Sequence, residues 1–243
     1  MKDKVIVITG ASAGIGAALA KQVHAAGARP VLVARRADLL REVSAACGNA
    51  RALVADVTQR AEVERVVREV LAAEQRLDVW VNNVGRGISR LPSELTDADL
   101  DEMLSINVKS ALYGMQAVLP HFKARGEGHV INVSSMLGRV PFALQRSAYS
   151  AAKHFLNALT ANFRAEVQAT HPRIHVSLFS PGAVATDFGV NALHGGVDSR
   201  TLPNAQSAEE VAGVLANLIA DPKPDVYSRP EFRQTVVDYF AKL

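Results

Sequence analysis

The chain has 243 residues, 49% of them hydrophobic, with a mean hydropathy of +0.08 and a formal net charge of +3. This length and composition fit one domain, 1–243, and leave little room for linkers or accessory domains. Acidic and basic residues are interspersed, which excludes the basic stripe of a nucleic-acid-binding protein, and no run reaches the ~18 apolar residues of a membrane span.

Short apolar runs alternate with longer segments of helical periodicity along most of the chain. The runs are almost entirely apolar, as buried parallel strands are, and they predict strands over 4–9, 30–34, 52–55, 79–81, 129–133 and 175–179. The longer segments predict helices over 15–26, 39–46, 61–75, 97–122 and 147–169. This alternation predicts an α/β fold with a single doubly wound parallel sheet, covered by helices on both faces.

The alternation stops after the sixth predicted strand. Residues 187–206 are rich in Gly, Asn, Ser and His without a clean period, and loops of this length tend to be functional, so we expect a mobile substrate-binding flap there. Helical periodicity returns over 208–220, a proline-bearing break follows at 221–224, and 231–241 is predicted to be a terminal amphipathic helix.

Cysteine and histidine usage points to a reducing compartment and to chemistry without a metal. The chain has one cysteine, Cys47, and its seven histidines are scattered without the spacing of metal ligands. The apolar run at the N-terminus is too short for a signal peptide. We therefore expect a cytoplasmic protein, with no metal site.

A glycine-rich turn, TGASAGIG, follows the first predicted strand. Gly10, Gly14 and Gly16 would let the backbone approach a pyrophosphate, whose charge is met by free amides and by the helix dipole. The spacing differs from the general G-x-G-x-x-G pattern, so a tight connection between strand and helix is the alternative. Its place at the first strand favours a nucleotide site.

The end of the second predicted strand indicates which dinucleotide binds. An acidic residue there would bind the 2'-hydroxyl of NAD, whereas the chain has Arg35 and Arg36, which can pair with the 2'-phosphate of NADP. The alternative is that both arginines are solvated and Asp38 contacts the ribose. Asp56, ahead of Val57, is predicted either to accept a hydrogen bond from adenine or to cap the next helix.

Tyr149 and Lys153 stand four residues apart within a predicted helix, so they share one helix face. A cation within about 4–6 Å lowers the pKa of a phenol toward neutrality, which a proton-transferring tyrosine needs. An ordinary surface helix is the alternative for these two residues taken alone.

Further polar motifs stand in order along the chain: Asn82-Asn83-Val84-Gly85, Asn107, Ser134-Ser135, Pro181-Gly182 and Thr186. Together with the glycine turn and the Tyr149 and Lys153 pair, they resemble the short-chain dehydrogenase/reductase family in its one-domain form of about 250 residues. The resemblance runs from Lys4 to about Thr186 and implies a Rossmann-type fold.

The resemblance also implies roles for individual residues. Tyr149 is expected to be the acid/base, Lys153 to lower its pKa and bind the nicotinamide ribose, and Asn107 to anchor a water-linked proton path. Ser135 is expected to orient the substrate oxygen; it is preferred to Ser134 because the segment that it begins aligns best with the family's Ser-x-x-Gly motif. The expected NADP(H)-binding residues are Gly10, Ser12, Gly14, Ile15, Gly16, Arg35, Arg36, Asp56, Val57, Asn83, Gly85, Tyr149, Lys153, Pro181, Gly182, Val184 and Thr186.

These residues predict an NADP(H)-dependent oxidoreductase that interconverts a ketone or aldehyde and an alcohol. A catalytically inactive dinucleotide-binding regulator is the alternative, and a sugar-nucleotide lyase or epimerase would need a longer C-terminal region. Residues 86–91, 136–145 and the flap are expected to line a substrate site with few fixed charges, which favours an uncharged carbonyl compound. Its expected apolar groups are Ile88, Met136, Leu137, Val140, Phe142 and Phe188. The family resemblance implies a homodimer or homotetramer through 97–122 and 147–169.

Overall fold

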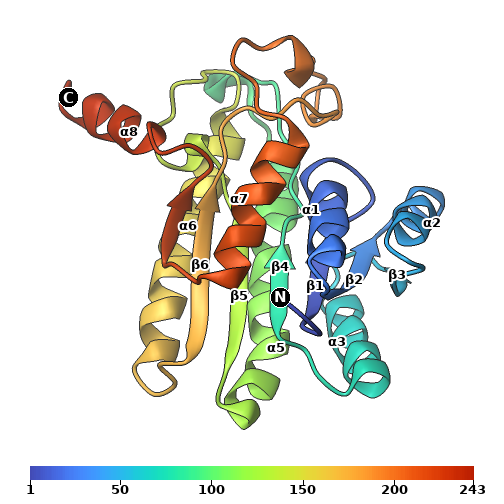
Figure 1. The fold of residues 1–243 in the computed structure, drawn as a ribbon. Coiled ribbons are helices and arrows are strands. Elements are labelled where there is room, and N and C mark those ends of the chain that lie inside the picture. The colour runs from blue at the N-terminus through green and yellow to red at the C-terminus, as the bar shows by residue number, and fades with distance from the viewer.

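The computed structural model describes residues 1–243 and contains one seven-stranded, all-parallel sheet (Figure 1). The strand order is β3-β2-β1-β4-β5-β6-β7, so the order reverses between β1 and β4. The strands are β1 Val5–Thr9, β2 Arg29–Ala34, β3 Ala52–Val54, β4 Val79–Asn82, β5 Gly128–Val133, β6 Ile174–Ser180 and β7 Asp225–Tyr227. In such sheets, ligands bind beyond the carboxyl ends of the strands where the order reverses.

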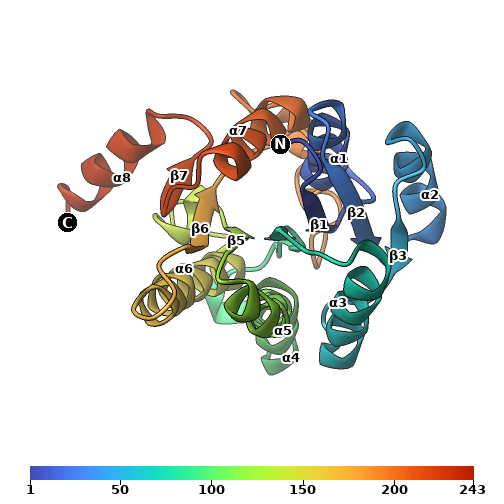
Figure 2. The ribbon, with the colours of Figure 1, turned by 60° about the horizontal axis from the view of Figure 1, so that its bottom comes forward.

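Helices cover both faces of the sheet. Figure 2 shows α1, α2 and α7 on one face and α3 to α6 on the other. The α-helices are α1 Gly14–Ala25, α2 Ala37–Ala46, α3 Arg60–Glu74, α4 Asp97–Leu104, α5 Ser110–Arg125, α6 Ser147–Gln168, α7 Ala208–Ala220 and α8 Phe232–Phe240. No residue of α8 is buried, and this helix projects from the body of the molecule (Figure 1).

The apolar strands form a core on each face of the sheet. All five residues of β1 are buried; Ile6 and Ile8 pack in the cluster beneath α1 and α7, whereas Val5 and Val7 pack in the cluster beneath α3 and α5. Side chains of a strand alternate between faces, so a strand buried on both sides must be apolar throughout. The α/β fold and the six predicted strands are therefore confirmed.

Two features of the fold differ from the sequence predictions. The sequence does not predict the seventh strand, β7, because Asp225–Tyr227 is a half-buried edge strand that begins with an aspartate and contains no apolar run. The long helix predicted over 97–122 is divided into α4 and α5 by a π-helical turn, Ser105–Lys109, and α5 continues to Arg125. In the described structure, no helix combines the length and apolarity needed to cross a bilayer.

Candidate active site

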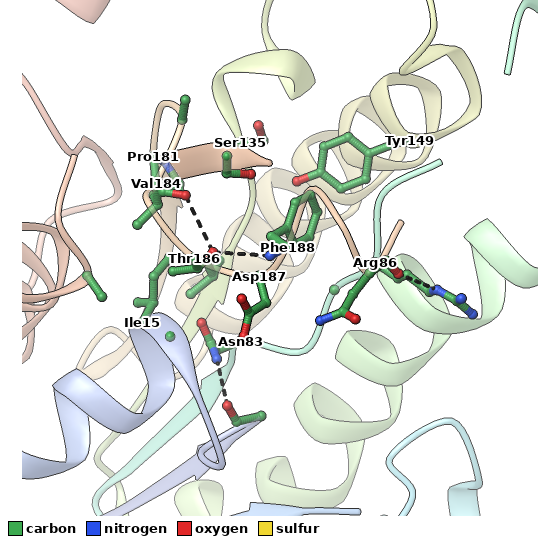
Figure 3. A pocket seen from close by; sticks show the side chains of 18 of the residues that line it. Ile15, Asn83, Arg86, Ser135, Tyr149, Pro181, Val184, Thr186, Asp187 and Phe188 are labelled. Atoms are coloured by element: carbon green, nitrogen blue, oxygen red, sulfur yellow. Dashed lines mark hydrogen bonds between the residues drawn. The ribbon is translucent and has the colours of Figure 1, made fainter. Parts of the chain in front are cut away.

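A cleft of about 1620 Å³ lies at the carboxyl ends of the strands (Figure 3). It is lined by every residue expected to bind the dinucleotide except Gly16, and also by Ser135. Asn107 is 1% exposed and lies behind the cleft wall. The fold thus brings together residues that are up to 176 positions apart, from Gly10 to Thr186.

The glycine turn leaves room and free donors for an anion. Gly10 and Gly14 have positive φ angles of 69° and 53°, and a Cβ on Gly16 would lie 2.4 Å from the Gly10 carbonyl oxygen. Helix α1 starts after Ala13 without a side-chain cap. The amides of its first turn therefore remain available for a pyrophosphate, together with the positive end of the helix dipole.

Asn83 fixes this turn against β1. Its Nδ2 donates to the Thr9 carbonyl oxygen at 3.0 Å, and its backbone N–H donates to Thr9 Oγ1 at 3.0 Å. On the opposite wall, Thr186 lies close to the turn, since its Cγ2 would be 3.2 Å from a Cβ on Gly14. The segment carrying Pro181 is also fixed, because the Pro181 carbonyl oxygen accepts from the Met136 amide at 2.8 Å.

The end of β2 presents two arginines to the cleft. Arg36 Nε and Nη2 donate to Ser12 Oγ at 3.3 and 3.1 Å, which joins this guanidinium to the glycine turn. The Arg35 side chain is 70% exposed and lies 3.9 Å from Asp56. Asp38 is 86% exposed, pairs with Arg41 and lies outside the cleft lining. Arg35 and Arg36 therefore line the cleft beside the glycine turn, whereas Asp38 does not.

Asp56 has a local structural role in addition to lining the cleft. Its Oδ1 accepts from the backbone N–H of Thr58 at 3.0 Å and from Thr58 Oγ1 at 2.8 Å, which stabilises the turn before α3. The carboxylate can therefore cap the turn while Oδ2 faces Arg35. The neighbouring Val57 is buried and also lines the cleft.

Tyr149 and Ser135 face each other across the cleft. Figure 3 shows the phenol oxygen pointing toward the Ser135 hydroxyl, and interaction with Ser135 acts to lower the pKa of Tyr149. Ser134, in contrast, donates to Asn157 Oδ1 and does not face the phenol. Ser135 Oγ also accepts from the Leu137 amide at 3.1 Å, which orients the hydroxyl. The geometry thus favours Ser135 over Ser134 as the serine beside the reacting group.

Lys153 lies beneath Tyr149 and is only 2% exposed. Its Nζ donates to the Val133 carbonyl oxygen at 2.9 Å and lies 5.7 Å from the centroid of the Tyr149 ring. Burial lowers the pKa of Lys153 to about 7 and raises the pKa of Tyr149 to about 12.

The expected lowering of the Tyr149 pKa by Lys153 is therefore not seen in this structure. Desolvation disfavours both charged forms, and the only cation that acts on the phenol is Arg146, which lowers its pKa to a smaller extent. Helical spacing predicted correctly that the two side chains share one face. The spacing could not predict that this helix face is shielded from solvent.

Asn107 sits in the π-helical turn between α4 and α5. Its Nδ2 donates to the carbonyl oxygens of Arg86 and Met103 at 3.0 and 3.1 Å, and its Oδ1 accepts from the Arg86 amide at 3.1 Å. A Cβ on Gly85 would lie 3.1 Å from Asn107 Oδ1 and 3.5 Å from Lys153 Nζ. The glycine thus leaves a narrow space between the amide and the ammonium, and π-helical turns are frequent at functional sites.

The expected flap, 187–206, is held against the rest of the cleft. Its Leu193 exchanges backbone hydrogen bonds with Gly87 and Ser89, each 2.9 Å long, and His194 Nε2 lies 2.6 Å from Asp99 Oδ1. The ring of Phe188 packs against Tyr149 with centroids 5.5 Å apart. The flap therefore shields the phenol from solvent.

Four of the six apolar residues expected at a substrate site line the cleft. Met136, Leu137, Phe142 and Phe188 line the cleft, whereas Ile88 and Val140 are fully buried in the interior. The prediction omitted Arg146, which lines the same end of the cleft. The only sequence signal for it was its position three residues before Tyr149, one turn along the helix.

Comparisons with known proteins agree with this geometry. The model of the short chain dehydrogenase family matches residues 4–195. An uncharacterized oxidoreductase of Staphylococcus saprophyticus is 34% identical over 189 residues, which cover 77% of this chain and 76% of that protein.

Two solved structures are similar over nearly their whole length. One is an alcohol dehydrogenase from Thermococcus sibiricus complexed with 5-hydroxy-NADP, with 26% identity, a TM-score of 0.79 and coverage of 93% of this chain and 96% of that chain. The other is 3-ketoacyl-(acyl-carrier-protein) reductase from Brucella melitensis complexed with NADH, with 26% identity, a TM-score of 0.83 and coverage of 93% and 98%.

Proposed function

Because the chain belongs to the short-chain dehydrogenase/reductase family, we propose that it is an NADP(H)-dependent oxidoreductase that interconverts a ketone or aldehyde and an alcohol. The observation that carries this proposal is the pair of hydroxyls of Tyr149 and Ser135, which face each other in a cleft whose far end is the glycine turn. The bound dinucleotide would supply the carbon that donates or accepts hydride.

The residues of this chain would handle the charge and the proton. Reduction leaves negative charge on the substrate oxygen, which the Ser135 hydroxyl stabilises and Tyr149 protonates. Burial raises the pKa of Tyr149 to about 12, so the phenol holds its proton at neutral pH and can donate it in the reductive direction. The Lys153 ammonium would return a proton to the phenol, and Asn107, on the other side of Gly85, would anchor the water-linked path that resupplies it.

The preference for NADP(H) rests on Arg35 and Arg36. Arg36 is joined to Ser12 of the glycine turn, and its remaining donors are free to meet a 2'-phosphate. Asp38, the acidic residue that could have bound a 2'-hydroxyl, pairs with Arg41 and lies outside the cleft lining. Similar proteins have been solved with both NAD-type and NADP-type dinucleotides, so the choice here depends on these side chains.

A catalytically inactive regulator is the second candidate. It would need the glycine turn and the arginines but not Ser135, Tyr149 and Lys153, which line the cleft, or Asn107, which lies behind its wall beside Gly85. Their presence favours an enzyme.

We further propose that the protein works in the cytoplasm as a homodimer or homotetramer. The lone thiol, Cys47, is buried and burial raises its pKa, which fits a protein that needs no disulfide. Leu100 on α4 and Phe155 on α6 are 42% and 54% exposed, so these helices offer apolar groups to a partner subunit. Light scattering on the purified protein would give the number of subunits.

The function is tested by calorimetric titration with NADPH and NADH, followed by a screen of ketones and aldehydes with the tighter-binding dinucleotide. We expect NADPH to bind more tightly and at least one moderately bulky carbonyl compound to be reduced. Binding of NADPH without turnover across the screen would favour the regulator.

A further inference from the structure

The substrate end of the cleft contains a guanidinium that has no acidic partner. Arg146 immediately precedes α6 and is half-buried, and its only side-chain hydrogen bond runs from Nη1 to the Ile88 carbonyl oxygen at 3.1 Å. No carboxylate lies within 4.0 Å of it. Burial lowers its pKa, which means that the charged form is poorly solvated where it stands.

The other arginines around this end of the cleft are all paired. Arg86 binds Glu102 at 2.5 Å, Arg200 binds Asp198 at 2.8 Å, and Arg229 binds Glu210 at 2.9 Å. A half-buried cation without a partner is costly unless something else compensates it. Arg146 therefore differs from its neighbours in a way that a ligand would explain.

The surrounding backbone makes room for this guanidinium. A Cβ on Gly87 would lie 2.9 Å from Arg146 Nη1, and a Cβ on Gly196 would lie 2.9 Å from Nη2. Gly87 belongs to the wall after β4 and Gly196 to the flap, so two separate segments lack side chains at the point where the group sits. The guanidinium is thus held between them, and Arg146 itself lines the cleft.

The position of Arg146 relates it directly to the reacting group. Its charge acts on the phenol and lowers the pKa of Tyr149, so the two groups lie within electrostatic reach of each other. The whole cleft is lined by eight lysines and arginines but only three carboxylates, which attracts anions. An anionic group bound to Arg146 would lie beside the carbonyl that Tyr149 protonates.

We propose that Arg146 binds a carboxylate of the substrate, so that the compound reduced or formed is an oxo acid or a hydroxy acid. One unpaired guanidinium matches one unit of negative charge and can hold a carboxylate through two parallel hydrogen bonds. This inference rests on the proposed carbonyl chemistry and replaces the uncharged substrate expected from the sequence. Arg146 is then a specificity residue and not part of the proton-transfer set.

The alternative is that Arg146 only ties the wall to the flap through Ile88. The test uses two acids, phenylpyruvate and 4-formylbenzoate, and compares each with its methyl ester. The quantities measured are the NADPH-dependent kcat/KM and the calorimetric affinity. We expect the wild type to prefer both acids. Arg146→Gln should lower kcat/KM for the acids about 10- to 100-fold and for the esters less than about threefold, and Arg146→Lys should keep part of the preference.

The ratio of kcat/KM for the acid to kcat/KM for its ester separates recognition of the carboxylate charge from other effects of the substitution. A change in the pKa of Tyr149 or a looser flap would change kcat/KM equally for acid and ester, and would leave the ratio of the two values unchanged. Arg139→Gln is the matched control, because Arg139 is already paired with Asp225 and does not line the cleft; its ratio should equal that of the wild type.

Two results would overturn the inference: acids that bind and react no better than their esters in the wild type, or equal losses for acid and ester in Arg146→Gln. If Arg146→Gln does not fold, the ratio measured with Arg146→Lys decides in the same way. Acids that bind in an Arg146-dependent manner, together with no turnover across the whole screen of ketones and aldehydes, would support the inference while refuting the proposed oxidoreductase activity.

Discussion

The arginines at the end of β2 allow the cofactor preference to be tested quantitatively. Arg36 is oriented by two hydrogen bonds to Ser12, whereas the Arg35 side chain is 70% exposed. We therefore expect Arg36→Ala to weaken NADPH binding more than Arg35→Ala does. Neither change should affect NADH strongly, since NADH has no 2'-phosphate.

The magnitude follows from the environment of each guanidinium. A hydrogen bond to a charged group contributes about 1.5–3 kcal/mol, so loss of the Arg36 contact should cost about 2 kcal/mol, or about 30-fold in Kd. The exposed Arg35 is screened by solvent and should contribute about 1 kcal/mol, or about fivefold. The double variant is expected to lose about 3 kcal/mol, or about 150-fold, for NADPH and less than about threefold for NADH.

Calorimetric titration of the wild type and the three variants with both dinucleotides measures these values. Arg41→Ala is the control, because Arg41 stands on α2, which directly follows the two arginines, is 71% exposed and pairs with Asp38 outside the cleft. The ratio of the Kd values for NADPH and NADH in Arg41→Ala should match that of the wild type. Equal losses for NADPH and NADH in the double variant would refute the assignment of Arg35 and Arg36 to the 2'-phosphate.

Three further predictions concern the reacting end and the flap. Tyr149→Phe should reduce kcat at least about 1000-fold while NADPH affinity stays within about threefold, because only the proton donor is removed; kinetics and calorimetry check this, and retained turnover would contradict it. Burial lowers the pKa of Lys153 to about 7 in the folded chain. Between pH 7 and the higher pKa of this lysine in the unfolded chain, the unfolded chain therefore holds a proton that the folded chain lacks. The free energy of unfolding of the wild type should therefore rise, relative to Lys153→Met, by about 2 kcal/mol from pH 7 to pH 9 in urea titrations; parallel pH profiles would show that the ammonium is not desolvated. His194→Ala removes the 2.6 Å contact to Asp99 and should speed proteolysis within 187–206 and raise KM more than it lowers kcat; unchanged cleavage would mean that this contact does not hold the flap.

The fold could be predicted from the sequence because its signals are local and strong. Strands such as Val5–Thr9 are apolar throughout, and the helices between them have clear periodicity. The sequence does not predict β7 because Asp225–Tyr227 has no apolar run, and its pairing depends on β6 being beside it. The π-helical turn at Ser105–Lys109 also has no sequence signature, although it sets the orientation of Asn107.

At the site, the sequence could predict which residues gather but not their electrostatics. Tyr149, Ser135 and the glycine turn line one cleft, as expected from parallel strands that end at the same edge. The depth of burial could not be predicted, and it decides the direction of the Tyr149 pKa. Arg146 was overlooked because its lack of a carboxylate partner appears only when the flap and the wall are placed in space.

NADPH that carries deuterium at the transferable position shows whether Tyr149 and Ser135 serve a hydride transfer to a carbonyl carbon. The wild type is expected to place the deuterium on the carbinol carbon of the product alcohol, and Tyr149→Phe and Ser135→Ala should form little labelled alcohol despite binding NADPH. Alcohol formed without the label, or labelled alcohol formed at the wild-type rate by Tyr149→Phe, would rule out these roles for the two hydroxyls.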